Sequence, residues 1–212
     1  MILFLDFDGV LHDNEAGLEL NVRDETSLQS LTDEQRRFIT RNGRLIVGEN
    51  LFEHADRLAV ELEPYPDVWI VITSTWRIHF ELEALKAFLP AALADRVVGI
   101  TPQVFSRDGV SQRVREIDAY FERSEHGFEP WVALDDQDWL FISGGGVSPY
   151  LVLLDGKEGF TDAAAVVLRQ YLRVAAEEEW NQQTIDRMGR MAVDKEYRKS
   201  VAKFICPNGD FD

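Results

Sequence analysis

The sequence has very little cysteine and no regular spacing of zinc ligands. Cys206 is its single cysteine, so no disulfide can form within the chain. Low cysteine content is typical of proteins from a reducing compartment, and we expect a cytoplasmic location. The four histidines are His12, His54, His79 and His126. None of them has a second histidine or a cysteine pair at the spacing of a zinc site, so the sequence predicts no such site.

Basic residues and long apolar runs are also scarce. Lysine and arginine total 22 against 38 aspartate and glutamate residues, which gives a formal net charge of −16. An acidic protein repels polyanions at long range, which disfavours nucleic acid as a general partner, although a locally basic cleft is compatible with this composition. No stretch approaches the roughly 18 apolar residues of a membrane span, and no charged leader precedes an apolar segment. We therefore expect a soluble protein that is neither secreted nor bound to a membrane.

The chain lacks internal repeats, low-complexity tracts and any break in composition, which favours one domain over its 212 residues. Short apolar runs alternate instead with segments of helical periodicity. The runs predict strands at Ile2–Leu5, Val68–Ile72, Val97–Ile100, Trp131–Leu134 and Tyr150–Leu154. The periodic segments predict helices at Leu51–Leu62, Ile78–Phe88, Ser111–Arg123 and Ala163–Ala176. Such alternation indicates an α/β fold with a parallel central sheet.

Two parts of the chain fall outside this alternation. Residues 11–48 are irregular, with an alternating segment at Leu18–Val22 and a capped helix at Asp33–Arg41, so we expect a flap or minimal cap insertion there. Residues 177–212 follow the last predicted helix and carry many charges. We interpret residues 1–176 as the core domain and residues 177–212 as a helical extension with an acidic tail.

Polar side chains follow three of the predicted strands, at the point where each strand ends. These residues are Asp6 and Asp8, Thr73 and Ser74, and Asp135 and Asp136. In open α/β sheets, ligands bind outside the carboxyl ends of the strands, so we expect these side chains to converge. Carboxylates that lie side by side repel each other unless a hard divalent cation lies between them. The sequence therefore predicts a cation site, and Mg²⁺ is the ion that we expect.

These groups supply what phosphoryl transfer needs. One carboxylate can attack phosphorus to form an aspartyl-phosphate, and a second can protonate the leaving oxygen and later activate water. A hydroxyl and a cation can hold the phosphate oxygens, and Arg113, at the start of a predicted helix, is the candidate cation. An acid that follows the predicted strand Trp131–Leu134 can complete the Mg²⁺ site.

The segments that carry these groups resemble, in order, the four motifs of the haloacid dehalogenase (HAD) superfamily of phosphohydrolases. The segments are D-F-D-G-V, V-I-T-S-T-W-R, R-V-R-E-I and A-L-D-D-Q-D. The resemblance implies a Rossmann-like three-layer α/β/α sandwich. It also implies that Asp6 is the nucleophile and that Asp8 is the general acid/base, with the Asp8 carbonyl on the metal. It further implies that Thr73 and Arg113 bind phosphate and that Asp136 binds Mg²⁺.

Two of these assignments have neighbouring alternatives. Ser74 is the alternative to Thr73 as the phosphate ligand, and Asp135 is the alternative to Asp136 as the Mg²⁺ ligand. Asp138 lies closer to Asp136 than the spacing often seen in the superfamily. We interpret Asp138 as a solvated turn residue.

The third motif departs from the superfamily pattern, which usually has lysine where this chain has Arg113. Arginine keeps the charge but replaces a point charge by a planar fork of donors. Arg115 is the alternative cation, and either side chain can instead be a solvated helix arginine. Trp76 and Arg77 follow the second strand and either contact the substrate or pack beneath the crevice.

The sequence as a whole predicts a Mg²⁺-dependent phosphohydrolase that acts through an aspartyl-phosphate on Asp6. By the resemblance, members with only a minimal cap often act on large substrates or use a partner as a lid, so we expect a phosphorylated substrate that can be a macromolecule. One alternative is a HAD-like regulatory protein that binds metal and phosphate but has little or no catalysis. Another is a phosphatase of the 3′- or 5′-phosphate ends of nucleic acids.

Overall fold

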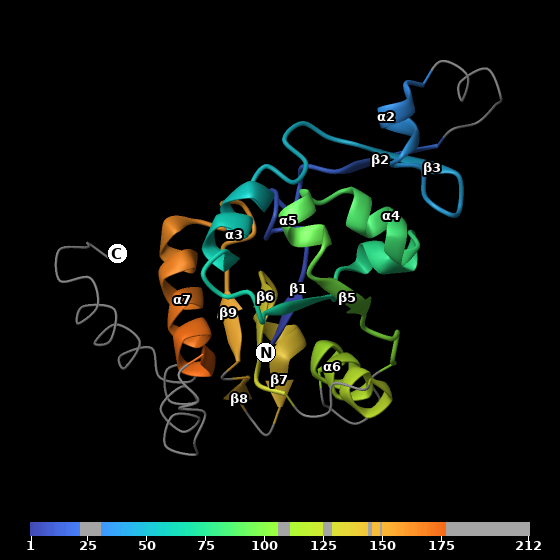
Figure 1. Cartoon of the computed structure of the whole chain (residues 1–212). Coiled ribbons are helices and arrows are strands. Elements are labelled where there is room, and N and C mark those ends of the chain that lie inside the picture. The colour runs from blue at the N-terminus through green and yellow to red at the C-terminus, as the bar shows by residue number, and fades with distance from the viewer. Residues whose placement is uncertain (22–30, 106–110, 125–128, 144–145, 149, 177–212) are drawn as a thin grey trace.

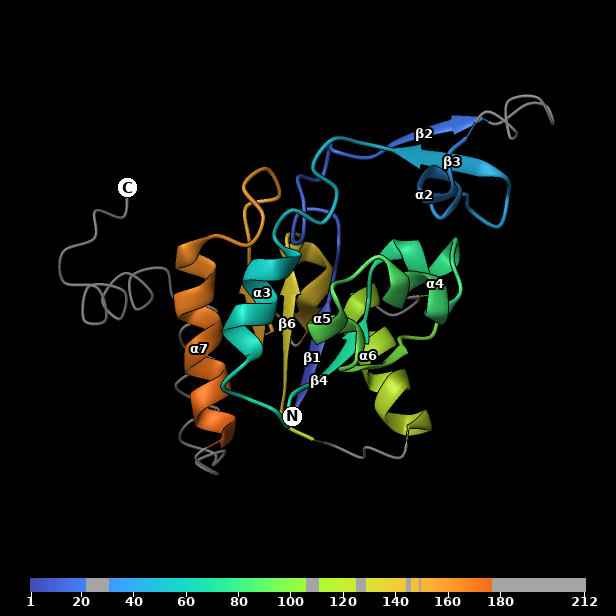
Figure 2. The ribbon, with the colours of Figure 1, turned by 45° about the horizontal axis from the view of Figure 1, so that its top comes forward.

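The computed structural model of the chain describes residues 1–21, 31–105, 111–124, 129–143, 146–148 and 150–176. At its centre is a five-stranded sheet in the order β5-β4-β1-β6-β9, in which every neighbouring pair is parallel (Figure 1, Figure 2). The strands are β1 (Ile2–Leu5), β4 (Trp69–Ile72), β5 (Val97–Ile100), β6 (Trp131–Asp135) and β9 (Leu151–Leu153). The predicted α/β fold with a parallel sheet is confirmed.

The central strand, β1, is buried on both faces because all four of its side chains are apolar. Leu3 and Leu5 belong to one core cluster, and Ile2 and Phe4 belong to another. Successive side chains of a strand point to opposite faces of the sheet. The two clusters are therefore the two cores of the domain, one on each face.

Helices cover both faces and complete a three-layer α/β/α sandwich. The helices are α3 (Ala55–Leu62), α5 (Ala91–Ala94) and α7 (Asp162–Ala176) on one face and α6 (Gln112–Arg123) on the other. Leu58, Leu93 and Leu168 pack in the first core, whereas Ile117 packs in the second with Phe4. Figure 2 shows α3 and α7 side by side along the sheet. The amphipathic periodicity of these helices explains their placement, because each presents an apolar stripe to the sheet.

The register of the sheet brings polar residues to one edge. Leu5, at the end of β1, pairs with Ile72 of β4 and with Leu134 of β6. The residues that follow these three are Asp6, Thr73 and Asp135. Because the strands are parallel, their carboxyl ends lie at the same edge, where ligands bind in this kind of fold.

The predicted insertion between β1 and β4 contains a small antiparallel sheet. Its strands are β2 (Leu18–Asn21) and β3 (Arg44–Val47), with the short helix α2 (Asp33–Arg36) between them. Figures 1 and 2 show this unit extending from the body of the domain, near the upper end of β1. Its role as a cap stays a prediction.

The helix predicted at Leu51–Leu62 is wrong in its first turn. α3 begins at Ala55, because Asn50 and Phe52 have left-handed backbone conformations with φ of 62° and 64°. Asparagine adopts this conformation readily, but a bulky residue such as Phe52 does so only where the surrounding structure holds it. A helix cannot pass through these two positions.

Two other predicted helices are shorter than expected. The helix predicted at Asp33–Arg41 ends at Arg36, after a capping box formed by Thr32 and Gln35. The helix predicted at Ile78–Phe88 is replaced by a 3₁₀ turn, η1 (Thr75–Ile78), followed by α4 (Leu82–Ala87).

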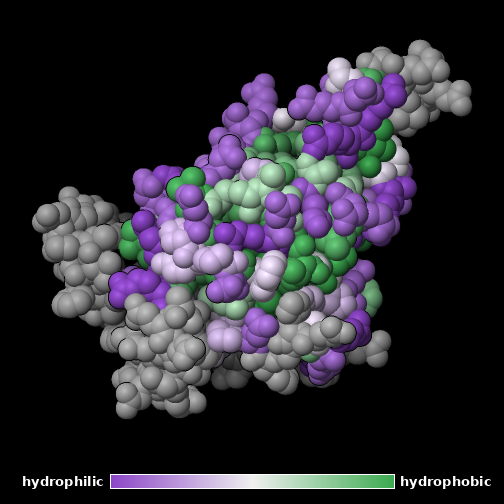
Figure 3. Space-filling view, viewed as in Figure 1, coloured by the Kyte–Doolittle hydropathy of each residue, from purple (hydrophilic) through white to green (hydrophobic). Residues whose placement is uncertain are grey.

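The face shown in Figure 3 is mainly hydrophilic, with smaller hydrophobic groups between the hydrophilic side chains. Within the described ranges, no helix is long and apolar enough to cross a membrane. The predicted extension at 177–212, with Cys206, lies outside the described residues.

Candidate active site

Three carboxylates meet at the carboxyl edge of the sheet. Asp6 follows β1, Asp135 ends β6, and Asp136 follows it; one oxygen atom from each lies within 4.8 Å of the others. Asp6 and Asp135 are buried, and Asp136 is partly buried. The structure thus brings together three of the four acids that we expected to converge. We call these three residues the acid cluster.

Arg113 binds the acid cluster from the first turn of α6. Its guanidinium Nε donates to Asp135 Oδ2 at 3.1 Å, and its Nη2 donates to Asp6 Oδ2 at 3.3 Å. Its Nη1 donates to the backbone carbonyl of Thr73. A planar fork of donors can make these contacts at once, whereas a lysine ammonium acts from a single point. Arg113, at the position expected from the third motif, therefore joins three strand ends.

A second buried ion pair, which the sequence pattern did not predict, supports Arg113. Glu116 lies one turn further along α6 and is fully buried. Its carboxylate contacts Arg113 Nη1 at 3.3 Å and Arg77 Nη2 at 2.7 Å. Arg77 in turn donates to the backbone carbonyls of Thr73 and Ser74. The available signal was the spacing of Arg113 and Glu116, which places them on one face of a helix.

Two buried hydroxyl residues, Thr73 and Ser74, follow β4. Their exposed fractions are 1% and 0%. The Ser74 side chain accepts the backbone N–H of Trp76 at 3.4 Å, and it lies near enough to the Asp6 carboxylate to oppose the rise that burial causes in the Asp6 pKa. Ser74, the alternative to Thr73 as the phosphate ligand, is therefore close to the expected nucleophile.

Asp8 is not a member of the acid cluster, and Trp76 and His12 hold its carboxylate instead. Trp76 Nε1 donates to the two Asp8 oxygens at 3.0 and 3.1 Å. His12 Nε2 lies 3.1 Å from Asp8 Oδ1, and His12 Nδ1 accepts the backbone N–H of Phe52 at 3.3 Å. Because Nδ1 is an acceptor, the proton of a neutral imidazole is on Nε2, which donates to Asp8. The two donors fix one orientation of a carboxylate whose side chain is 33% exposed.

The acid cluster fits a hard divalent cation. Asp136 Oδ1 is buried, and no described residue donates a hydrogen bond to it. A buried carboxylate oxygen without a partner is unfavourable, and a cation would supply the missing contact. Mg²⁺ typically binds one or two carboxylates together with water and phosphate oxygens, and these acids offer such ligands.

Two glycines make room for the Asp136 carboxylate. A Cβ atom at Gly9 would lie 2.5 Å from Asp136 Cγ, and one at Gly156 would lie 2.4 Å from Asp136 Oδ2. Gly9 also has a left-handed backbone, with φ of 68°. Asn14 Nδ2 donates to Asp136 Oδ2 at 3.4 Å. Gly9, Gly156 and Asn14 therefore determine where this carboxylate lies.

Replacing Gly9 by alanine should weaken Mg²⁺ binding at least about tenfold, because the new methyl group must displace the Asp136 carboxylate. Gly43 is the matched control, since its φ is 70° and a Cβ atom added there would have no atom within 4 Å. Both variants carry the left-handed strain of about 1–2 kcal/mol, so only Gly9→Ala should lose metal affinity. Calorimetric Mg²⁺ titration measures this difference, and equal affinities in the two variants would contradict it.

Burial raises the pKa of all three members of the acid cluster. For Asp6, desolvation raises the pKa, and the Arg113 guanidinium opposes this effect. For Asp135, desolvation and the neighbouring Asp6 charge raise the pKa well above its usual range. For Asp136, desolvation raises the pKa, and the hydrogen bond from Asn14 opposes it. A bound cation would favour the charged forms of all three carboxylates.

The HAD superfamily has this arrangement: a parallel α/β sheet with acids at the ends of β1 and β6, hydroxyl residues after β4, and a basic side chain on the helix that precedes β6. The family model described as "HAD domain in Swiss Army Knife RNA repair proteins" matches residues 2–165. The chain belongs to this family, which confirms the resemblance noted in the sequence. No curated protein and no solved structure matches the chain.

Proposed function

We propose that the protein is a Mg²⁺-dependent phosphatase that removes a terminal phosphate from RNA through a phosphorylated Asp6. The observation that carries this proposal is the contact of Arg113 with both Asp6 and Asp135 inside the acid cluster. Phosphoryl transfer requires three kinds of group at one point: a nucleophilic carboxylate, a guanidinium and a pair of metal-ligating acids.

Asp6 is oriented for attack on phosphorus by two fixed contacts. Its Oδ1 accepts the Phe7 backbone N–H at 2.8 Å, and its Oδ2 accepts from Arg113. Attack forms the bond between Asp6 and phosphorus and breaks the bond to the leaving oxygen. Arg113 and the Ser74 or Thr73 hydroxyl donate to the phosphate oxygens. Bound Mg²⁺, held by the acid cluster and the Asp8 carbonyl, would neutralise charge on the transferring group.

Asp8 performs the proton transfers in this proposal. Its protonated carboxyl donates to the leaving oxygen, and the resulting carboxylate then takes a proton from the water that hydrolyses the phosphorylated Asp6. This second step releases phosphate and restores both acids. Trp76 and His12 hold Asp8 in one orientation, which keeps it in position for both steps.

The family supports RNA as the macromolecular substrate. Its description places HAD domains in RNA repair proteins, and repair requires the phosphates at broken ends to be processed. The net charge of −16 disfavours binding to nucleic acid over a broad surface but permits recognition of one phosphorylated end.

Oligoribonucleotides with a single 3′- or 5′-terminal phosphate test this proposal. We expect release of inorganic phosphate from at least one of them, and a loss of at least about a hundredfold in rate in EDTA, because the metal supplies several kcal/mol of charge stabilisation. Excess Mg²⁺ should restore the rate. If the protein releases no phosphate from these substrates or from an aryl phosphate, yet Mg²⁺ raises its melting temperature, the proposal is wrong and the alternative of a regulatory binding protein is supported.

A further inference from the structure

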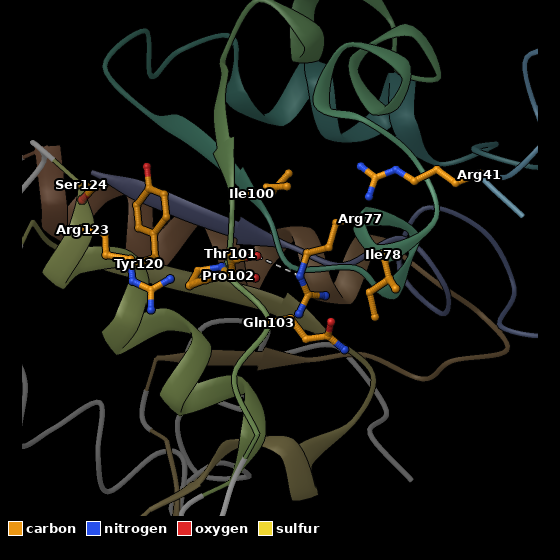
Figure 4. A pocket seen from close by; sticks show the side chains of 10 residues that line it. All are labelled: Arg41, Arg77, Ile78, Ile100, Thr101, Pro102, Gln103, Tyr120, Arg123 and Ser124. Carbon is orange, nitrogen blue, oxygen red and sulfur yellow. Dashed lines mark hydrogen bonds between the residues drawn. The ribbon is translucent and has the colours of Figure 1, made fainter.

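A pocket of about 430 Å³ lies along the edge strand β5 (Figure 4). Its wall includes Thr101 after β5, Arg77 of η1 and Tyr120 of α6. In Figure 4, Arg41 of the insertion and Arg123 of α6 lie toward opposite ends, with Arg77 between them. We call this pocket the edge groove.

The edge groove is basic, although the chain as a whole is acidic. Its ten lining residues include three arginines and no acidic residue; the buried Glu116 compensates the charge of Arg77, so Arg41 and Arg123 supply the positive charge of the groove. Arg123 is exposed, and no described acidic residue forms an ion pair with it.

Arg41 pairs with Glu81 at 2.8 Å, but the two side chains are 46% and 80% exposed. Arg41 Nη2 also donates to the Phe80 carbonyl at 3.1 Å. Exposed ion pairs contribute little, so Arg41 can exchange Glu81 for a phosphate while it keeps the bond to Phe80.

An exposed aromatic ring lies next to the edge groove in sequence. Phe105 is 74% exposed and follows the lining residue Gln103 by two positions. Bases of single-stranded nucleic acid stack on aromatic side chains near positively charged grooves, and the position of Phe105 in the chain makes it the candidate for this role. Charge and stacking together favour a polynucleotide over a small anion.

Arg77 connects the edge groove to the active site. Its Nε donates to the Thr101 carbonyl at 3.1 Å, its Nη1 donates to the carbonyls of Thr73 and Ser74, and its Nη2 contacts Glu116. All of its described contacts are structural, so it forms a wall shared by the two sites.

The length of α6 gives the distance between the active site and the far end of the groove. From Glu116, beneath the active site, to Arg123 the helix spans about 10 Å at a rise of 1.5 Å per residue. This length corresponds to about three nucleotides of one strand at a rise of about 3.4 Å.

We propose that the edge groove binds the single-stranded RNA that continues from the terminal phosphate in the active site. Arg41 and Arg123 contact the phosphates of this strand, and Phe105 stacks on a base. The inference rests on the proposed phosphatase function and adds the path of the substrate.

The test is the affinity of phosphate-terminated oligoribonucleotides of different lengths, measured by fluorescence anisotropy in the Asp6→Asn protein so that they are not hydrolysed. We expect the affinity to rise with length up to about four nucleotides, which fill the active site and the groove, and then to level off. Arg41→Ala and Arg123→Ala should each weaken binding of the longer strands roughly two- to fivefold. Each should also lower the slope of log affinity against log salt by about 0.7.

Arg169→Ala is the matched control, because Arg169 lies on α7, away from the edge groove, and is 47% exposed with Glu61 as its partner at 3.4 Å. It should leave the affinity unchanged. Equal affinity for mononucleotides and longer strands, or equal effects of Arg123→Ala and Arg169→Ala, would overturn the edge groove as an RNA site even if the wild-type protein releases phosphate. Length-dependent binding without phosphate release by the wild type would instead overturn the proposed phosphatase alone.

Discussion

Replacing Asp6 by asparagine is expected to lower phosphate release by about a thousandfold or more, because the amide cannot form the covalent intermediate. The change is nearly isosteric, and the amide oxygen can still accept the Phe7 N–H. The amide NH₂ replaces the oxygen that accepts from Arg113, but Arg113 keeps its contacts with Asp135 and Glu116. The fold should therefore survive. Initial rates of phosphate release from an end-phosphorylated oligoribonucleotide and from an aryl phosphate measure the effect.

Asp95→Asn is the matched control for this experiment. Asp95 is exposed at the end of α5, so the same chemical change there should leave the rate unchanged. Circular dichroism checks that both variants are folded. Turnover by folded Asp6→Asn at the wild-type rate would show that Asp6 is not the nucleophile.

Replacing Glu116 by alanine should lower the free energy of unfolding by about 3–5 kcal/mol. Glu116 contacts both Arg77 and Arg113, whose exposures are 5% and 4%. Removing its carboxylate leaves two buried guanidinium groups without this partner. Urea denaturation measures the loss, with the midpoint shifted and the m-value unchanged if only the native state is affected.

Two further variants isolate the charge in this prediction. Glu116→Gln keeps the volume and one acceptor but removes the charge, so it should be less destabilising than alanine. Glu122→Ala removes a carboxylate from an exposed position on the same helix and should change stability by only about 0.5 kcal/mol. A loss for Glu116→Ala no larger than that for Glu122→Ala would contradict a stabilising role of the buried pair.

The sheet and the polar residues at its edge could be predicted because they depend on local patterns. A run such as Ile2–Leu5 is too apolar for a surface, and the acid that follows it marks the strand end. Parallel pairing then places Asp6, Thr73 and Asp135 at one edge, whatever the lengths of the connections between them. Arg113 could be predicted for a related reason, since a helix after β5 begins at the same edge.

The supporting residues could not be predicted, because their roles depend on contacts between distant segments. The spacing of Arg113 and Glu116 indicates a shared helix face, but the burial of Glu116 also depends on Arg77, which comes from another element. His12 has no sequence signal that points to the Phe52 N–H, which fixes its tautomer. The left-handed conformation of Phe52, which shortens α3, also has no sequence signal, because bulky residues rarely adopt it.

The central claim is that Asp6 itself becomes phosphorylated, and trapping this intermediate tests it most directly. The protein is mixed with an end-phosphorylated oligoribonucleotide, quenched in acid within one turnover and reduced with borohydride, which converts an aspartyl-phosphate to homoserine. Peptide mass spectrometry then locates the change. We predict homoserine at position 6, dependent on Mg²⁺ and on substrate. Phosphate release with unmodified Asp6, or homoserine at another position, would contradict the account.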